Sequence, residues 1–112
     1  MKLEGKAKML RIHFGEDDKW KGKPLYEAIV SKCAELGIAS AIVYRGIEGF
    51  GASSRIHTTR FLSLSQDLPI AIVIVDERER IDAFLPQLDE LVTEGLVILD
   101  DVEVIRYVGR SS

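Results

Sequence analysis

Hydrophobic and polar positions alternate with a period of two along residues 8–14, a pattern typical of a half-buried strand. Three further segments, 40–45, 69–77 and 96–108, are rich in Val and Ile and predict strands as well. The segment 69–77 is apolar on both faces, and Asp100–Asp101 could interrupt the last segment. The hydrophobic pattern therefore predicts four strands.

Two other segments place apolar residues three or four positions apart, which is the spacing of a helix with one buried face. The first helix is predicted to begin near Pro24 and to stop at Gly37, a residue that suits a helix C-terminus. The second helix is predicted over residues 78–92. Pro86 lies inside it and removes a backbone donor, so a bend or a broken turn is expected near Asp82.

The order strand, helix, strand, strand, helix, strand predicts an α+β fold of the ferredoxin-like type. In this fold, two helices cover one face of a four-stranded antiparallel sheet. The other face should be polar if water covers it, yet Val73 and Val75 are predicted to point there. We therefore expect a second copy of the chain to cover this face. The alternative is that a central strand is simply apolar on both faces.

Composition limits the range of functions. The 112 residues suffice for a single domain, 1–112, with an ordinary share of hydrophobic residues. The formal net charge of −3 argues against a nucleic-acid binder, which usually presents a basic surface. No apolar signal segment or membrane span is visible, so a cytoplasmic protein is expected. Cys33 is the only cysteine; it is expected in the core and excludes an internal disulfide.

The connection between the second and third strands, residues 46–68, is much longer than a hairpin turn requires. It begins with three glycines that would let a ligand approach the main-chain amides: Gly46, Gly49 and Gly51. Basic side chains at its ends and within it could bind phosphate or carboxylate oxygens: Arg45, Arg55, His57 and Arg60. The segment thus predicts an anion site, and the alternative is a flexible surface loop with solvated arginines.

Several segments resemble, in this order, the PII-like proteins of the domain-of-unknown-function family 190. They cover nearly the whole chain: "GKPLYEAIV" (22–30), "YRGIEGFG" (44–51), "FLSLSQDLPI" (61–70), "IVDERERI" (74–81) and "EGLVILDDVEVI" (94–105). The resemblance implies a ferredoxin-like homotrimer in which the sheets of the subunits cover one another. It also implies a T-loop after the second strand, adenine nucleotides bound between subunits at its base, and a target protein such as a membrane transporter or channel.

By this similarity, residues 46–51 would form the first part of the T-loop and residues 52–66 its mobile part. The candidate nucleotide- or anion-binding residues are Arg45, Gly46, Gly49, Phe50, Gly51, Arg60 and Arg106. The candidate partner-binding residues are Ser53, Ser54, Arg55 and His57. Phe50 could either stack on a nucleotide base or hold the loop to the body of the domain.

PII proteins also bind phosphates with a second loop, which contains glycine and lysine and follows the second helix. The corresponding residues of this chain, 92–101, contain one glycine and no lysine or arginine. We therefore expect a regulatory nucleotide with fewer phosphates than ATP, such as AMP or ADP, and Arg106 could replace some of the missing charge. No other cofactor is expected.

The resemblance favours a signalling regulator that is not an enzyme. The alternative is a small ferredoxin-like enzyme that acts on a phosphorylated or acyl-phosphate substrate. An acylphosphatase requires a catalytic asparagine, and this chain has none. The two histidines, His13 and His57, lack cysteine or carboxylate partners at ligand spacing, so no metal is expected.

Overall fold

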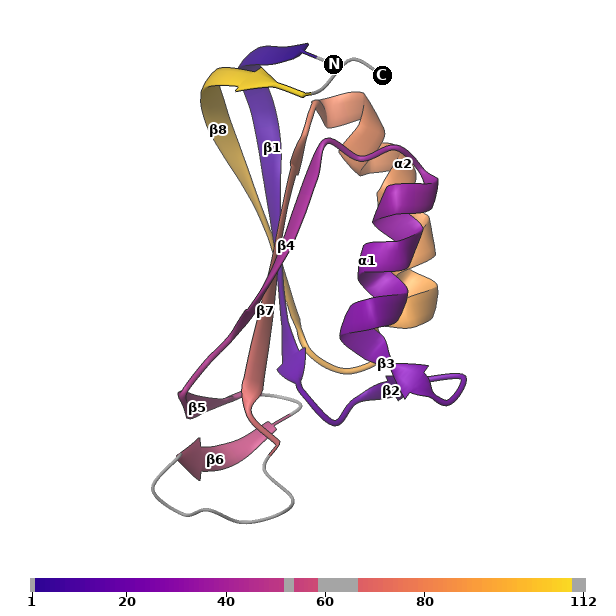
Figure 1. The fold of residues 1–112 in the computed structure, drawn as a ribbon, viewed down its shortest axis with the longest axis vertical. Helices are drawn as coiled ribbons and strands as arrows, with labels where there is room; N and C mark the ends of the chain where they lie inside the picture. The colour runs from indigo at the N-terminus through magenta and orange to yellow at the C-terminus, as the bar shows by residue number, and fades with distance from the viewer. Residues whose placement is uncertain (1, 52–53, 59–66, 110–112) are drawn as a thin grey trace.

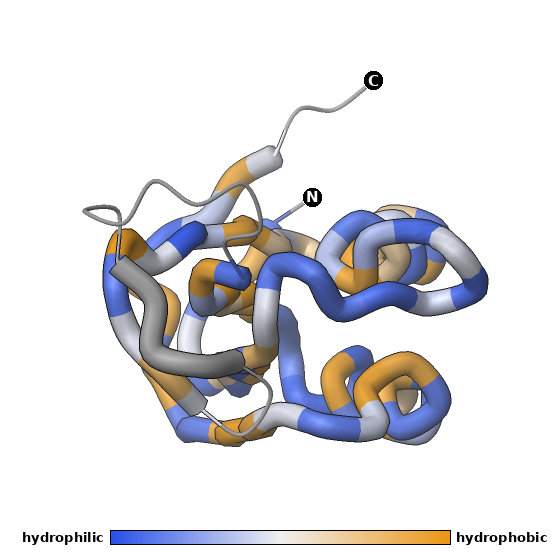
Figure 2. Tube along the Cα trace, turned by 90° about the horizontal axis from the view of Figure 1, so that it is seen from below, coloured by the Kyte–Doolittle hydropathy of each residue, from blue (hydrophilic) through white to orange (hydrophobic). Residues whose placement is uncertain are grey.

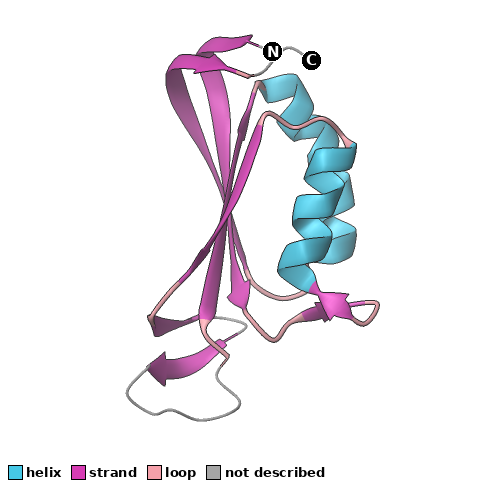
Figure 3. Ribbon diagram, viewed as in Figure 1, coloured by secondary structure: helices cyan, strands magenta, loops and turns pink. Residues whose placement is uncertain are grey.

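The computed structural model describes residues 2–51, 54–58 and 67–109, with the backbone alone for residues 54–58. A four-stranded antiparallel sheet has the order β4-β7-β1-β8. Its strands are β1 (Lys2–Gly15), β4 (Ser40–Arg45), β7 (Pro69–Asp76) and β8 (Leu96–Val108). The helices α1 (Leu25–Glu35) and α2 (Arg78–Leu91) lie side by side on one face of the sheet (Figures 1 and 3). This arrangement confirms the ferredoxin-like fold expected from the sequence.

The core lies between the helices and the sheet, because alternate residues of the two central strands point toward the helices. β1 and β7 place three buried pairs there: Leu10 with Ile74, Ile12 with Ile72, and Phe14 with Ile70. The helices contribute a stripe of buried side chains: Leu25, Ile29, Cys33, Ile81, Phe84, Leu88 and Leu91. The core position of Cys33 is confirmed, and burial raises the pKa of its thiol to about 11.

Helix α2 continues through Pro86, so the broken turn expected near Asp82 does not form. Both residues are exposed, and water can therefore reach the Asp82 carbonyl that the proline leaves without a donor. Helix α1 begins after Pro24 and ends before Gly37, close to the predicted limits. No helix in the described part of the chain is long and apolar enough to cross a membrane.

Strand β8 is also continuous, although its sequence contains two adjacent aspartates. Both are exposed on this edge strand, and Asp101 forms an ion pair with Lys8 of β1. The hydrogen bond and the charge of Lys8 lower the pKa of Asp101. Strand β1 starts at Lys2, earlier than predicted, because the first residues of the chain pair with the end of β8.

The segment between β4 and β7 contains secondary structure that the sequence did not predict. Strands β5 (Glu48–Gly51) and β6 (Ser54–Thr58) form an antiparallel hairpin at one end of the sheet (Figure 1). Part of the segment expected to be mobile, 52–66, is therefore a strand, while residues 52–53 and 59–66 lie outside the described residues. A second small hairpin, β2 (Lys19–Trp20) and β3 (Lys23–Pro24), precedes α1 at the same end of the molecule, which faces the viewer in Figure 2.

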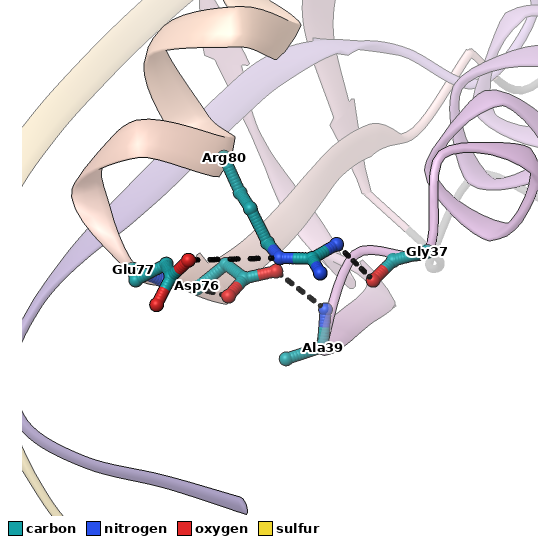
Figure 4. Close-up of polar contacts among 5 residues, drawn as sticks. All are labelled: Gly37, Ala39, Asp76, Glu77 and Arg80. Atoms are coloured by element: carbon teal, nitrogen blue, oxygen red, sulfur yellow. Dashed lines mark hydrogen bonds and ion pairs between the residues drawn. The ribbon is translucent and has the colours of Figure 1, made fainter. Parts of the chain in front are cut away.

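The opposite end of the sheet is fixed by a buried carboxylate. Asp76, at the end of β7, accepts hydrogen bonds from the backbone N–H groups of Ala39 at 2.9 Å and Glu77 at 2.7 Å (Figure 4). Beside it, the Arg80 guanidinium donates to the Gly37 carbonyl at 3.1 Å. These contacts join the turn after α1 to the start of α2, and thereby set where β4 begins.

The sheet face that points away from the helices is called the outer face below. Strand register sorts its residues into three rows: Ser40, Val75, Met9 and Asp100; Ile42, Val73, Arg11 and Ile98; Tyr44, Ala71, His13 and Leu96. Val73 and Val75 thus point to this face, as expected. Several of its apolar side chains remain about half exposed in the single chain, for example Ile42 at 50%.

Candidate functional site

The two ends of the long connection meet because β4 and β7 are adjacent antiparallel strands. The Gly46 N–H donates to the Pro69 carbonyl at 2.7 Å, which closes the segment directly beyond the two strands. The chain after β1 joins them, since the Glu16 N–H donates to the Leu68 carbonyl at 2.8 Å. These three segments, 15–18, 45–46 and 67–69, are called the loop base below.

Side chains that lie close to the backbone explain two glycines of the loop base. A β-carbon on Gly46 would lie 2.7 Å from Cγ of Pro69, and one on Gly15 would lie 2.5 Å from Oδ1 of Asp67. The first glycine therefore serves the shape of the loop base. Its N–H is already bound within the chain, so it is not a free donor for a ligand.

Arg45, which with Arg60 is one of the two main anion candidates from the sequence, lies at the end of β4 and already has a partner. Its Nη2 atom is 2.5 Å from Oε2 of Glu16, and the two side chains are 58% and 21% exposed. A partly exposed ion pair of this kind contributes little to stability, about 0–1 kcal/mol. An anionic ligand at Arg45 would have to compete with Glu16.

Carboxylates dominate the described side chains of the loop base. Asp67 accepts a hydrogen bond from the Asp17 N–H at 2.8 Å, and Glu16 and Asp18 lie in the same segment as Asp17. The described side chains of the loop base therefore include four carboxylates and one guanidinium, that of Arg45. Reasoning from the sequence missed this, because residues 16–18 and 67 are far apart in the chain. The available signal was the acidic run directly after β1, which antiparallel pairing brings beside the start of β7.

The remaining glycine-rich residues lie in strand β5. Gly49 pairs with His57 and Gly51 with Ser54 across the hairpin. Phe50 between them is 72% exposed, so it does not hold the loop to the body of the chain. That alternative is wrong for the single chain, and the phenyl ring remains available to stack on a ligand or to contact another molecule.

Other predicted residues do not join the loop base within one chain. Arg106 is exposed near the far end of β8, beside Tyr107, which pairs with Leu3. The loop base lies at the other end of that strand, where Leu96 pairs with His13. Arg55 belongs to β6 together with Ser54 and His57, described by their backbone alone, and Ser53 and Arg60 lie outside the described residues.

Two surface grooves do not involve the predicted site residues. The larger, about 460 Å³, is lined by Trp20, Lys23, Glu27, Ala28, Ser31, Lys32, Glu35 and Leu91. The smaller, about 190 Å³, lies between the start of the β2–β3 hairpin and the end of α2. Among the residues whose side chains are described, no three His, Cys, Asp or Glu groups are placed to hold a metal ion.

The connection between α2 and β8 contains a glycine for a structural reason. Gly95 has φ near 149°, and a β-carbon there would lie 2.5 Å from the His13 carbonyl oxygen. This glycine therefore lets the connection pass close to the end of β1. It gives no sign of a phosphate-binding loop at this position.

Comparison with known proteins places these features in a family context. The family model DUF190, described as "Uncharacterized ACR", matches residues 7–104. A UPF0166 protein of Aquifex aeolicus (strain VF5) is 38% identical over 100 residues, which cover 89% of this chain and 94% of that protein. A UPF0166 protein of Methanocaldococcus jannaschii is also 38% identical, over 102 residues that cover 90% of this chain and 94% of that protein.

Solved structures with the same fold are PII and PII-like proteins. The complex of B. subtilis GlnK with ATP has a TM-score of 0.57 at 12% identity and covers 89% of this chain and 84% of GlnK. CPII from Thiomonas intermedia K12, bound to ADP and bicarbonate, has a TM-score of 0.56 at 17% identity and covers 93% and 91% of the two chains. The TM-scores establish a common fold. At identities this low, they establish nothing beyond the fold.

Proposed function

Because the chain belongs to the DUF190 (UPF0166) family and has the fold of PII proteins, we propose that it is a non-enzymatic regulator that works as a homotrimer. An adenine nucleotide, AMP or ADP, binds between subunits near the loop base. The 46–68 loop then carries the signal to a target protein, such as a membrane transporter or channel.

One observation carries the proposal: the long connection is fixed at its base and exposed beyond it. Hydrogen bonds from Gly46 and Glu16 hold the base to the start of β7. Beyond this point Ile47 is 75% and Phe50 72% exposed. A monomer that acted alone would gain nothing from such apolar exposure, whereas a regulator uses it to contact a ligand or a partner.

The solved relatives in fold support a nucleotide as the ligand. GlnK was solved with ATP and CPII with ADP. In this chain, Arg45 directly precedes the loop and Arg60 lies within it, and both would supply donors for phosphate oxygens. Since the acidic loop base opposes extra negative charge, a nucleotide with few phosphates suits it better than ATP.

The site requires a second subunit. Arg106 lies at the opposite end of its own sheet from Arg45, so one chain does not bring these two arginines together. A neighbouring subunit would close the open side of the loop base, and its β8 strand would bring an arginine toward the ligand.

Calorimetric titration with AMP, ADP and ATP tests the nucleotide site. Arg60→Ala should weaken binding by about 1.5–3 kcal/mol, the contribution of a hydrogen bond to a charged group. That corresponds to a loss of roughly tenfold to a hundredfold. Arg78→Ala is the matched control, because Arg78 lies on α2 and pairs with Asp82 at 3.5 Å. If no nucleotide binds the wild type at millimolar concentration, the nucleotide assignment is wrong.

Native mass spectrometry of the purified protein tests the assembly and reports any nucleotide that purifies with it. A trimer is expected at micromolar concentration. Val73→Asp should disrupt the trimer or the fold, because an unpaired carboxylate on the outer face would be buried at a cost of several kcal/mol. A wild-type protein that is monomeric at this concentration would exclude a site between subunits.

A further inference from the structure

At the centre of the outer face, two polar side chains lie among apolar residues. Arg11 and His13 both lie on β1, a central strand of the sheet, and point to this face. Arg11 is flanked by Val73 on β7 and Ile98 on β8. A molecule that covers the centre of this face would therefore enclose both polar groups.

Neither group has a partner among the residues whose side chains are described. No ion pair within 4 Å joins Arg11 to a carboxylate of residues 2–51 or 67–109. The Nε2 atom of His13 is shielded from water and has no hydrogen-bond partner among the same residues. A shielded polar atom without a partner is uncommon in a finished structure. The outer face of the isolated chain is therefore incomplete.

Covering Arg11 with apolar groups alone would be costly, since an uncompensated buried charge costs several kcal/mol. Whatever covers the outer face must bring both apolar area and an acceptor to the position of Arg11. An unrelated apolar surface or a lipid layer supplies the first without the second. The requirement therefore selects a partner that carries a carboxylate within an apolar face.

The chain itself carries such a carboxylate. Asp100 lies on the outer face of the edge strand β8, opposite Met9 and close to Ile98. It is exposed and forms no ion pair among the described residues. Within one chain Arg11 and Asp100 lie diagonally on neighbouring strands, and no ion pair joins them. A second copy offers the apolar cover and the missing charge together.

We infer that a second copy of the chain covers the outer face and that Arg11 pairs with the partner subunit's Asp100. The contact is heterologous: the centre of one sheet meets the edge strand of the next. Repetition of such a contact by rotation closes a ring, which agrees with three subunits. This inference rests on the homotrimer of the proposed function and adds the ion pair that fixes its register.

A charge exchange tests the pair. Arg11→Glu and Asp100→Arg should each raise the concentration needed for assembly about tenfold or more, because each places like charges in contact across the interface. The double variant Arg11→Glu/Asp100→Arg should restore assembly to near the wild-type concentration. Sedimentation velocity over a dilution series measures this, and circular dichroism checks that each variant is folded.

Two matched controls change the same charges on the helix side of the molecule. Arg78→Glu and Asp89→Arg lie on exposed positions of α2 and should assemble like the wild type. If Arg11→Glu fails to fold, Asp100→Arg decides the matter alone, because Asp100 is an exposed residue of an edge strand.

The outcomes separate this inference from the proposed function. A monomeric wild type contradicts the homotrimer itself. A trimeric wild type whose folded single variants assemble equally well leaves the homotrimer intact and overturns the Arg11–Asp100 pair. If the single variants lower the Tm but leave the assembly concentration unchanged, the pair acts within one chain. If the double variant stays dissociated, Arg11 contacts another group of the partner. Either result overturns the inference.

Discussion

Replacing Asp76 with alanine tests how the end of the sheet opposite the loop is held together. The Asp76 side chain is almost fully buried and accepts hydrogen bonds from the N–H groups of Ala39 and Glu77. Alanine leaves both donors without their acceptor. Ala39 is half-buried, so its N–H loses most, whereas water can reach the exposed Glu77.

The expected loss follows from these two contacts. A hydrogen bond to a charged group contributes about 1.5–3 kcal/mol. Counting the bond to Ala39 in full and the bond to Glu77 at less than half, we expect Asp76→Ala to lower the free energy of unfolding by about 2–4 kcal/mol. For a domain of this size the Tm should fall by about 8–20 °C.

Urea and thermal unfolding followed by circular dichroism measure this loss, at one protein concentration because assembly links stability to concentration. Asp82→Ala is the control, since its exposed pair with Arg78 is worth only about 0.3–0.5 kcal/mol. Asp76→Asn should cost nearly as much as alanine, because an amide offers one acceptor oxygen and turns a donor toward the other N–H. An alanine variant that loses under about 1 kcal/mol, or full rescue by asparagine, would refute the reasoning.

Three further outcomes are expected. Glu16→Gln should strengthen nucleotide binding about two- to fivefold in calorimetry, because it frees Arg45 from an ion pair worth up to about 1 kcal/mol. Gly95→Ala should lower the free energy of unfolding by about 2–4 kcal/mol in urea titrations, through its φ value and its contact with a backbone carbonyl. Cys33 should resist alkylation near neutral pH until the chain unfolds, and its stabilising effect should fade between pH 9.0 and about 11.

Each outcome has a control. Glu27→Gln removes the same charge from an exposed position on α1 and should leave nucleotide affinity unchanged. Gly22→Ala has a positive φ with open space around it, so it should cost only about 1 kcal/mol. The sign for Cys33 follows from the raised pKa: the folded state holds the thiol proton more tightly, so stability is full below the ordinary value and is lost as the thiol ionises.

Hydrophobic periodicity was enough to place the central elements. Strand β4 and helix α2 have the predicted limits within one residue, because the burial of alternate or helically spaced side chains determines where they lie. The pattern did not predict the first residues of β1 as a strand. Their sequence is largely polar, and they pair with β8 through backbone hydrogen bonds. The β5–β6 hairpin was not predicted for a similar reason, because its glycines leave no apolar alternation to read.

The candidate site was only partly predictable. From Arg45 and the glycines, the sequence predicted a positively charged site that binds an anion. The fold does bring the two ends of the loop together. It also brings Glu16 and Asp67, which local spacing could not show because tertiary pairing places them there. A site assembled from three strand ends depends on sheet register, and register is a property of the whole fold.

Strand β4 joins the outer face to the loop base. Ile42 and Tyr44 point to the outer face, whereas Arg45 points to the other side and meets Glu16, because successive residues of a strand face opposite ways. A subunit that covers the outer face therefore contacts Tyr44. The next residue, Arg45, is the one whose ion pair with Glu16 a bound anion would break. Coupling between assembly and ligand binding then requires no route through the core. Such coupling is reciprocal: if a nucleotide strengthens the trimer, the trimer must bind the nucleotide more tightly, and the measured affinity must fall when the protein is diluted below its assembly concentration.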